Sequence, residues 1–183
     1  MPRSIAIHDA RLKGQFRAGS MGLDYVMRVG RHDALEWAFL KTQSYARAHG
    51  GLARLVILCH GYERVITDEA TQESVVGGGF GLQLCREGLN NRTVGLGRIL
   101  RGHVETIVVY ACAAADTHAN FQAMAGDGQL LCRELAAHTG ATVYASAATQ
   151  YYAPETGDFG IWEGQVFRFT PRGERIEVES NPL

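Results

Sequence analysis

With 183 residues, the chain is long enough for a substantial core, and we expect residues 1–183 to form a single domain. Hydrophobic residues make up 46% of the chain, which argues against disorder. The formal net charge is −1, which gives no reason to expect nucleic acid or an acidic membrane as a partner. No apolar run reaches the ~20 residues of a membrane span, and residues 1–14 lack the apolar stretch of a signal peptide. We therefore expect a cytoplasmic protein, while export by a route that needs no such signal stays open.

The first half of the chain predicts two short strands, a helix and a central strand. Residues 4–9 and 23–30 are the short strands, and 33–51 is the helix, with Asp33 as its cap. Residues 53–61, "ARLVILCHG", are apolar on both faces, as a central parallel strand should be.

The stretch 62–79 is polar and ends in three glycines, so it predicts a mobile loop or a short hairpin. The remaining elements are an alternating strand at 80–89, a short helix at 93–102, an apolar strand at 104–112, a helix at 128–140, a third apolar strand at 141–147 and antiparallel strands within 159–180. Asp127 and Gly140 are the expected cap and end of the helix at 128–140. This order predicts an α/β three-layer sandwich with a mainly parallel central sheet and antiparallel C-terminal strands.

Four cysteines are spaced too widely for a zinc ribbon or finger, and disulfides are a poor default in a reducing compartment. Cys59, Cys85 and Cys132 fit small buried hydrophobes. Cys59, His60 and Cys112 could bind zinc if they converged, but adjacent strand residues point to opposite faces. We expect no metal and no cofactor.

We expect His60 and Cys112 to carry the chemistry. Each comes at the end of an apolar strand, and ligands of parallel sheets bind outside the carboxyl ends of the strands. An imidazole can take the proton of a thiol and later give it to a leaving amine, and the N–H groups of Gly61 and Cys112 could face an oxyanion. A lone cysteine after a strand is more often core, and a lone histidine beside glycine more often a turn residue. Their joint placement after two separate strands favours a catalytic pair.

These segments carry a resemblance. "VILCHG" and "TIVVYACAAAD" resemble the His-Gly and Ala-Cys motifs of the caspase-like cysteine peptidases, and the separation of 52 residues (112 − 60) suits the caspase pattern of about 50. The segments "LCRELAAHTGATVYASA" and "GDFGIWEGQVFRF" extend the similarity to a largely uncharacterised bacterial domain of that fold, found in very large surface proteins. The resemblance covers residues 53–170 and implies a caspase-like fold.

The resemblance further implies His60 as general base and acid, Cys112 as nucleophile and Gly61 as oxyanion donor. It places the pocket for the residue before the scissile bond in the loop after the next strand, and the residues expected there are Ser146, Thr149, Gln150, Tyr151, Tyr152 and Asp158. Because residues 146–152 contain no Arg, and Asp158 would pair with a cation, we expect a basic or neutral residue before the scissile bond.

Three functions stay open. The first is a cysteine endopeptidase that cleaves a protein or peptide substrate. The second is a non-catalytic protein-interaction module on the same scaffold, and the third is another thiol hydrolase or acyltransferase. The sequence leaves the oligomeric state undetermined.

Overall fold

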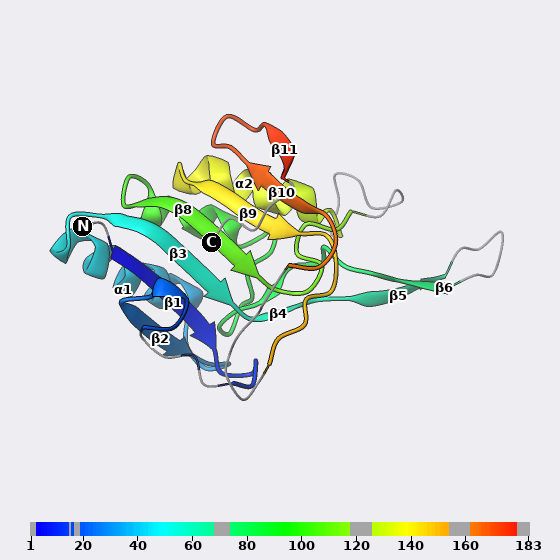
Figure 1. The fold of residues 1–183 in the computed structure, drawn as a ribbon, viewed down its shortest axis with the longest axis horizontal. Helices are drawn as coiled ribbons and strands as arrows, with labels where there is room; N and C mark the ends of the chain where they lie inside the picture. The colour runs from blue at the N-terminus through cyan, green and yellow to red at the C-terminus, as the bar shows by residue number, and fades with distance from the viewer. Residues whose placement is uncertain are drawn as a thin grey trace.

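A seven-stranded sheet runs through the molecule in the computed structural model, which describes residues 3–14, 16, 19–67, 74–117, 126–153 and 162–178 (Figure 1). Its strand order is β2–β1–β3–β8–β9–β10–β11. The strands are β1 (Arg3–Asp9), β2 (Tyr25–Val29), β3 (Leu52–Leu58), β8 (Val104–Tyr110), β9 (Thr142–Ser146), β10 (Val166–Phe169) and β11 (Arg175–Val178). The pairings from β2 to β9 are parallel and those of β10 are antiparallel. The predicted α/β class with antiparallel C-terminal strands is confirmed.

Helices cover one face of this sheet, behind the strands in Figure 1. They are α1 (Leu35–Ala48), the 3₁₀ helix η2 (Val94–Leu100) and α2 (Gly128–Thr139). Phe39, Leu100 and Leu135 from these helices belong to the main core cluster together with β3 and β8 side chains. Side chains of the segment after β1, which includes the short 3₁₀ helix η1 (Ser20–Gly22), cover the other face together with Trp162. Within the described residues, no helix combines the length and apolar character that crossing a membrane requires.

Helix α2 begins and ends where the sequence predicts. The Asp127 carboxylate accepts from the Leu130 N–H at 2.9 Å, and Gly140 adopts a left-handed φ of 71°. Both signals act within one turn of the helix itself, so the sequence alone was enough to find them.

Helix α1 begins differently from its prediction. Asp33 does not cap it, because its carboxylate accepts from the Gly30 N–H at 2.8 Å. The first helical N–H, that of Leu35, donates instead to the carboxylate of Glu87 at 2.9 Å. A carboxylate stabilises a helix N-terminus from any position in the chain, and here it comes from a distant segment.

Two further pairs of strands lie outside the main sheet. The predicted hairpin within 62–79 is present as β5 (Arg64–Thr67) and β6 (Ser74–Gly77), which project from the body of the molecule (Figure 1). The predicted strand at 80–89 is mostly wrong, because only β7 (Leu82–Gln83) is extended, and it pairs with β4 (His60–Gly61). The chain turns at Cys85, where φ is +57°.

Candidate active site

The C-terminal ends of the parallel strands meet at one edge of the sheet. Leu58, the last residue of β3, pairs with His8 of β1 and with Tyr110, the last residue of β8. His60 and Cys112 each follow by two residues, His60 after Leu58 and Cys112 after Tyr110. The expected placement of the two residues after adjacent parallel strands, at the same edge, is confirmed.

The backbone of Gly61 lies directly against that of Cys112. A Cβ atom on Gly61 would lie 1.8 Å from the carbonyl oxygen of Cys112 and 2.9 Å from its carbonyl carbon. No side chain fits in that space, so a glycine is required after His60. This close approach brings the His60–Gly61 pair to Cys112.

Cys112 is the one of the four cysteines that is only half-buried, and all four are free thiols. Its thiol donates to the carbonyl of Gln150 at 3.6 Å. Burial raises the pKa of the Cys112 thiol, and the nearby Glu63 charge adds to that rise. Hydrogen bonds from the backbone at Cys112 itself and at Gly61 act in the opposite direction. The net direction is upward, so the resting group is the neutral thiol.

The other three cysteines are buried. Burial raises the pKa of Cys85 and of Cys132 to about 12, and it raises the pKa of Cys59 further. Such thiols stay protonated and shielded from reagents. The prediction that they lie in the interior is confirmed for all three.

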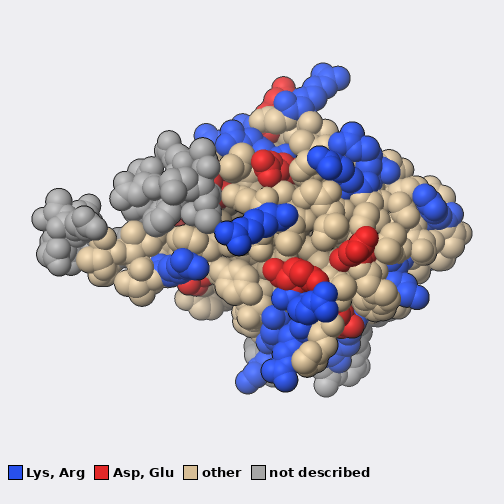
Figure 2. All heavy atoms as spheres, turned by 180° about the vertical axis from the view of Figure 1, so that it is seen from behind, with Lys and Arg blue, Asp and Glu red and all other residues tan. Residues whose placement is uncertain are grey.

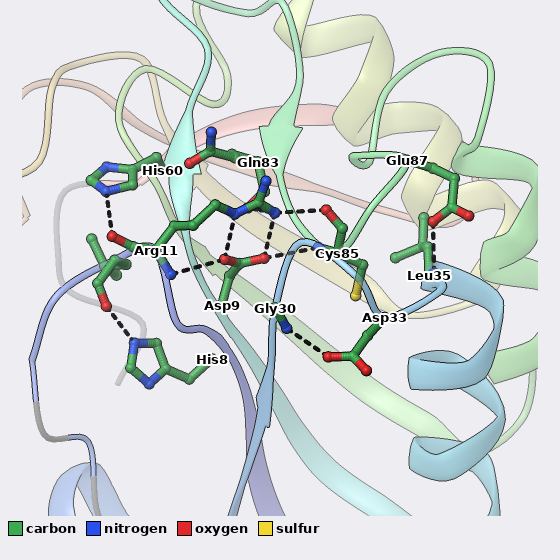
Figure 3. Close-up of polar contacts among 11 residues, drawn as sticks. His8, Asp9, Arg11, Gly30, Asp33, Leu35, His60, Gln83, Cys85 and Glu87 are labelled. Atoms are coloured by element: carbon green, nitrogen blue, oxygen red, sulfur yellow. Dashed lines mark hydrogen bonds and ion pairs between the residues drawn. The ribbon is translucent and has the colours of Figure 1, made fainter.

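The imidazole of His60 is held by a backbone carbonyl. Its Nε2 atom lies 3.2 Å from the carbonyl oxygen of Arg11, at the exit of β1 (Figure 3). A carbonyl can only accept, so Nε2 carries the proton of the neutral ring and Nδ1 keeps its lone pair. The contact therefore selects the tautomer and leaves Nδ1 as the basic atom.

Arg11 also clamps the segment that pairs with His60. Its guanidinium forms a bidentate ion pair with the fully buried carboxylate of Asp9, with Nε–Oδ1 at 2.8 Å and Nη2–Oδ2 at 2.7 Å (Figure 3). The same guanidinium donates to the carbonyl of Cys85 at 2.6 Å and to that of Gln83 at 3.3 Å. Gln83 is the strand partner of His60. One cation thus ties together both supports of the imidazole, the β1 exit and β7.

The buried Asp9 carboxylate has a full set of partners. Besides the guanidinium, it accepts from the backbone N–H groups of Arg11 at 3.1 Å and Cys85 at 2.8 Å. Burial by itself would raise the pKa of Asp9, but the bonds from Arg11 and Cys85 outweigh burial and hold the pKa below its usual range. Asp9 is therefore an ionised anchor for Arg11.

The residue after Cys112 has a strained backbone. Ala113 has a φ of +45°, a region that residues with a Cβ rarely adopt and that costs roughly 1–2 kcal/mol. Its N–H donates to the Ala148 carbonyl at 2.8 Å and its carbonyl accepts from the Gly79 N–H at 3.0 Å. Strain of this kind, fixed by surrounding bonds, often marks a functional turn.

The three glycines at 77–79 are buried, and Gly78 and Gly79 pack against this turn. A Cβ on Gly78 would lie 2.2 Å from the Cβ of Ala113, and one on Gly79 would lie 2.1 Å from the Asp116 carbonyl oxygen. The Gly78 N–H also donates to the Asp116 carboxylate at 2.7 Å. The glycines let the chain leaving β6 support the loop that follows Cys112.

Two of the expected pocket residues use their side chains inside the protein. The Ser146 hydroxyl is buried, donates to the Glu163 carbonyl at 2.7 Å and accepts from the Ala148 N–H at 3.0 Å. The Gln150 amide donates to the carbonyls of Ala148 at 3.0 Å and Glu163 at 2.9 Å. Their side chains stabilise the loop from inside the protein.

The other expected pocket residues differ in exposure. Thr149 is exposed and donates to the Glu63 carboxylate at 2.7 Å. Tyr151 is 71% exposed. Tyr152 packs against Phe16, and burial, followed by the charge of Cys112, raises the pKa of its hydroxyl. Asp158 lies outside the described residues.

Sequence reasoning missed Asp9 and Arg11, and it gave Glu63 no role. Glu63 instead binds Thr149 and lies close enough to Cys112 to raise its pKa. A signal for Asp9 was available, because a carboxylate that ends a core strand is as unusual as an imidazole there. Among the described residues, no three His, Cys, Asp or Glu side chains gather as metal ligands.

Comparison with known proteins yields no match to a family model and no match to a curated protein. The arguments for a function are therefore those of the motifs and of the site geometry.

Proposed function

We propose that the chain is a caspase-like cysteine endopeptidase with Cys112 as nucleophile and His60 as general base and acid. The observation that carries the proposal is the contact of the Gly61 backbone with Cys112, directly after His60, beyond two adjacent central strands. The sequence resemblance supports the same assignment. A cytoplasmic location goes with it, since free thiols persist in a reducing compartment.

In the proposed first step, the Cys112 sulfur attacks the carbonyl carbon of a peptide bond while its proton moves to Nδ1 of His60. The N–H groups of Cys112 and Gly61 stabilise the resulting oxyanion. This role is supported by the close contact of the Gly61 and Cys112 backbones, which brings the two N–H groups into one region.

In the following steps, the C–N bond breaks, His60 returns the proton to the leaving amine, and a thioester remains on Cys112. Water then adds to the thioester with His60 as base, which releases the carboxylic acid and restores the thiol. Because burial raises the pKa of Cys112, proton transfer to His60 belongs to the attack step rather than to a resting ion pair.

The charge near Cys112 supports a basic or neutral residue before the scissile bond. The Glu63 carboxylate is held by Thr149 and acts electrostatically on Cys112, so negative charge acts on the reacting sulfur. It would attract a Lys or Arg side chain and repel an acidic one. In this proposal Glu63 and Thr149, rather than Ser146 and Gln150, recognise the substrate residue before the scissile bond. Asp158 is still proposed to pair with a basic side chain there.

The raised pKa of Cys112 favours a second candidate, an interaction module on the same scaffold in which the thiol does not react. A third candidate, a thiol acyltransferase or other thiol hydrolase, shares every step up to the thioester and differs in what accepts the acyl group. The reaction products therefore distinguish the three candidate functions.

The test is digestion of a proteome-derived peptide library, read by mass spectrometry, with the wild type, Cys112→Ala and His60→Ala. We expect new peptide termini with the wild type alone, enriched in Lys, Arg or neutral residues before the cut. The matched control is Cys132→Ser, a buried thiol whose loss should leave cleavage in place. Equal cleavage by Cys112→Ala would overturn the proposal, and acyl transfer to added amines without hydrolysis would favour the third candidate.

A further inference from the structure

A pocket of about 460 Å³ opens between β2 and α1, at the end of the sheet, and shares no residue with the site around Cys112. Its lining includes the buried Ile5, Met27 and Thr42 and the partly exposed rings of Tyr25 and Trp37. Tyr25 is 44% exposed and Trp37 is 41% exposed. Aromatic side chains with this exposure beside a hollow are typical of a binding surface.

The shape of the pocket fits an extended chain. On α1 the lining runs from Trp37 to Tyr45, which at 1.5 Å per residue is about 12 Å. On β2 it runs from Tyr25 to Arg28, which is roughly 10 Å for a strand. Three to four residues of an extended peptide cover that length at about 3.3 Å each.

The backbone beside the pocket is a free sheet edge within the described residues. β2 is the terminal strand of the seven-stranded sheet, and its one strand partner there is β1. The outer side of such a strand presents N–H and C=O groups that can pair with another strand. An extended peptide that pairs with β2 would place alternate side chains over the pocket.

The charge of the pocket is positive. Arg28 and Lys41 belong to its lining, which contains no Asp or Glu. Neither cation forms an ion pair with a carboxylate of the described residues, and Lys41 lies 6.0 Å from the ring centre of Trp37. On the face seen in Figure 2, by contrast, Lys and Arg are interspersed with Asp and Glu. Acidic side chains on the peptide would complement the two cations.

We propose that the β2–α1 pocket binds an extended, acidic segment of another protein, which adds to the sheet along β2. On the side facing α1, an apolar side chain of the segment enters between the aromatic rings, and a carboxylate two residues along reaches Lys41. Because Arg28 lies on the opposite face of β2 from Met27, the carboxylate of the intervening residue reaches Arg28. The interaction is independent of the proposed peptidase activity because the two sites share no residue.

The test uses a fluorescent peptide that repeats Val-Glu-Glu-Glu, which as a strand presents Val and Glu in turn on one face and Glu on the other. It is titrated against the full chain, with Trp37 emission as a second readout. Trp37 reports on the pocket because the other tryptophan, Trp162, is buried. We expect saturable binding below about 1 mM that weakens with salt. Combined Arg28→Glu and Lys41→Glu should weaken it by about five- to tenfold, since each exposed pair contributes modestly. The matched control is Arg172→Glu, an exposed cation in the turn before β11.

Two matched peptides make the outcome decisive. One replaces every Glu with Lys and should not bind; the other carries a central Pro, which cannot donate to a strand, and should bind at least tenfold more weakly. Equal binding of either peptide, or no effect of the charge reversals, would overturn the proposal. Self-association of the chain that is abolished by the same substitutions would overturn it in favour of a second copy.

Discussion

The Nε2 atom of His60 lies 3.2 Å from the carbonyl oxygen of Arg11, a residue 49 positions earlier in the chain. The side chain of that same Arg11 is anchored by the buried carboxylate of Asp9. Orientation of the imidazole therefore depends on an ion pair that does not itself touch the reacting atoms, and Asp9 and Arg11 are positioning residues.

Replacing Arg11 should impair turnover more than substrate binding. Arg11→Lys keeps the charge but loses the two-pronged geometry, so we expect the imidazole to shift and kcat to fall by up to about 100-fold with little change in KM. The pH profile of kcat should change as well, which a purely structural role would not require. Kinetics across pH, with circular dichroism as a check of folding, measure both; an unchanged kcat and pH profile would remove Arg11 from the positioning role.

The Asp9–Arg11 pair should also show coupling in a double-mutant cycle. Arg11→Ala leaves the buried Asp9 carboxylate without its cation, and because the Arg11 side chain is 27% exposed we expect a cost below the ~3–5 kcal/mol of a fully buried pair. Asp9→Ala with Arg11→Ala removes both charges, so the double variant should lose clearly less stability than the sum of the single variants. Denaturant unfolding measures the free energies, and additivity would mean that the pair does not act as a unit.

Gly61→Ala should disrupt the site. The added Cβ would lie 1.8 Å from the Cys112 carbonyl oxygen, so one of the two segments must move. We expect loss of turnover and a destabilisation of about 1–3 kcal/mol. Gly95→Ala is the matched control, because a Cβ there meets no atom within 4 Å. Normal turnover in Gly61→Ala would contradict the assigned contact.

Alkylation of Cys112 should reflect its raised pKa. Because burial, with help from Glu63, favours the neutral thiol, the rate with iodoacetamide should keep rising with pH beyond the ordinary thiol range. Glu63→Gln removes the negative charge, lowers the pKa and should speed alkylation at a fixed pH. Glu177→Gln, on the distant strand β11, should change nothing. A slower reaction in Glu63→Gln would reverse the assigned sign.

Stability should fall in two separate pH windows. His8 is buried, and burial lowers its pKa, so its contribution is complete above the unfolded value of 6.5 and is lost as the pH falls below it. The pKa of Asp9 is lowered as well, so its contribution is lost only below the unfolded value of 3.8. When thermal unfolding is measured across pH, the loss of stability below the unfolded pKa of histidine should disappear in His8→Gln. The loss below the unfolded pKa of aspartate should disappear in Asp9→Asn. Unchanged profiles in either variant would contradict its assignment.

The sequence by itself determined the central part of the fold and the placement of His60 and Cys112 at one edge of the sheet. Strands that are apolar on both faces and alternate with helices imply a parallel sheet. In such a sheet, residues that directly follow neighbouring strands lie at the same edge. The ends of α2 were equally predictable, since Asp127 and Gly140 act on their own helix.

Only the tertiary structure decided what surrounds that pair. The Arg11 carbonyl at His60, the Glu87 carboxylate at the start of α1 and the inward use of the Ser146 and Gln150 side chains all depend on segments far apart in the chain. Hydrophobic periodicity reports which face of an element is buried, but it does not say which distant carbonyl or carboxylate will meet a polar group there. Such partners are fixed when the whole chain packs, because each buried polar group must then find a hydrogen bond.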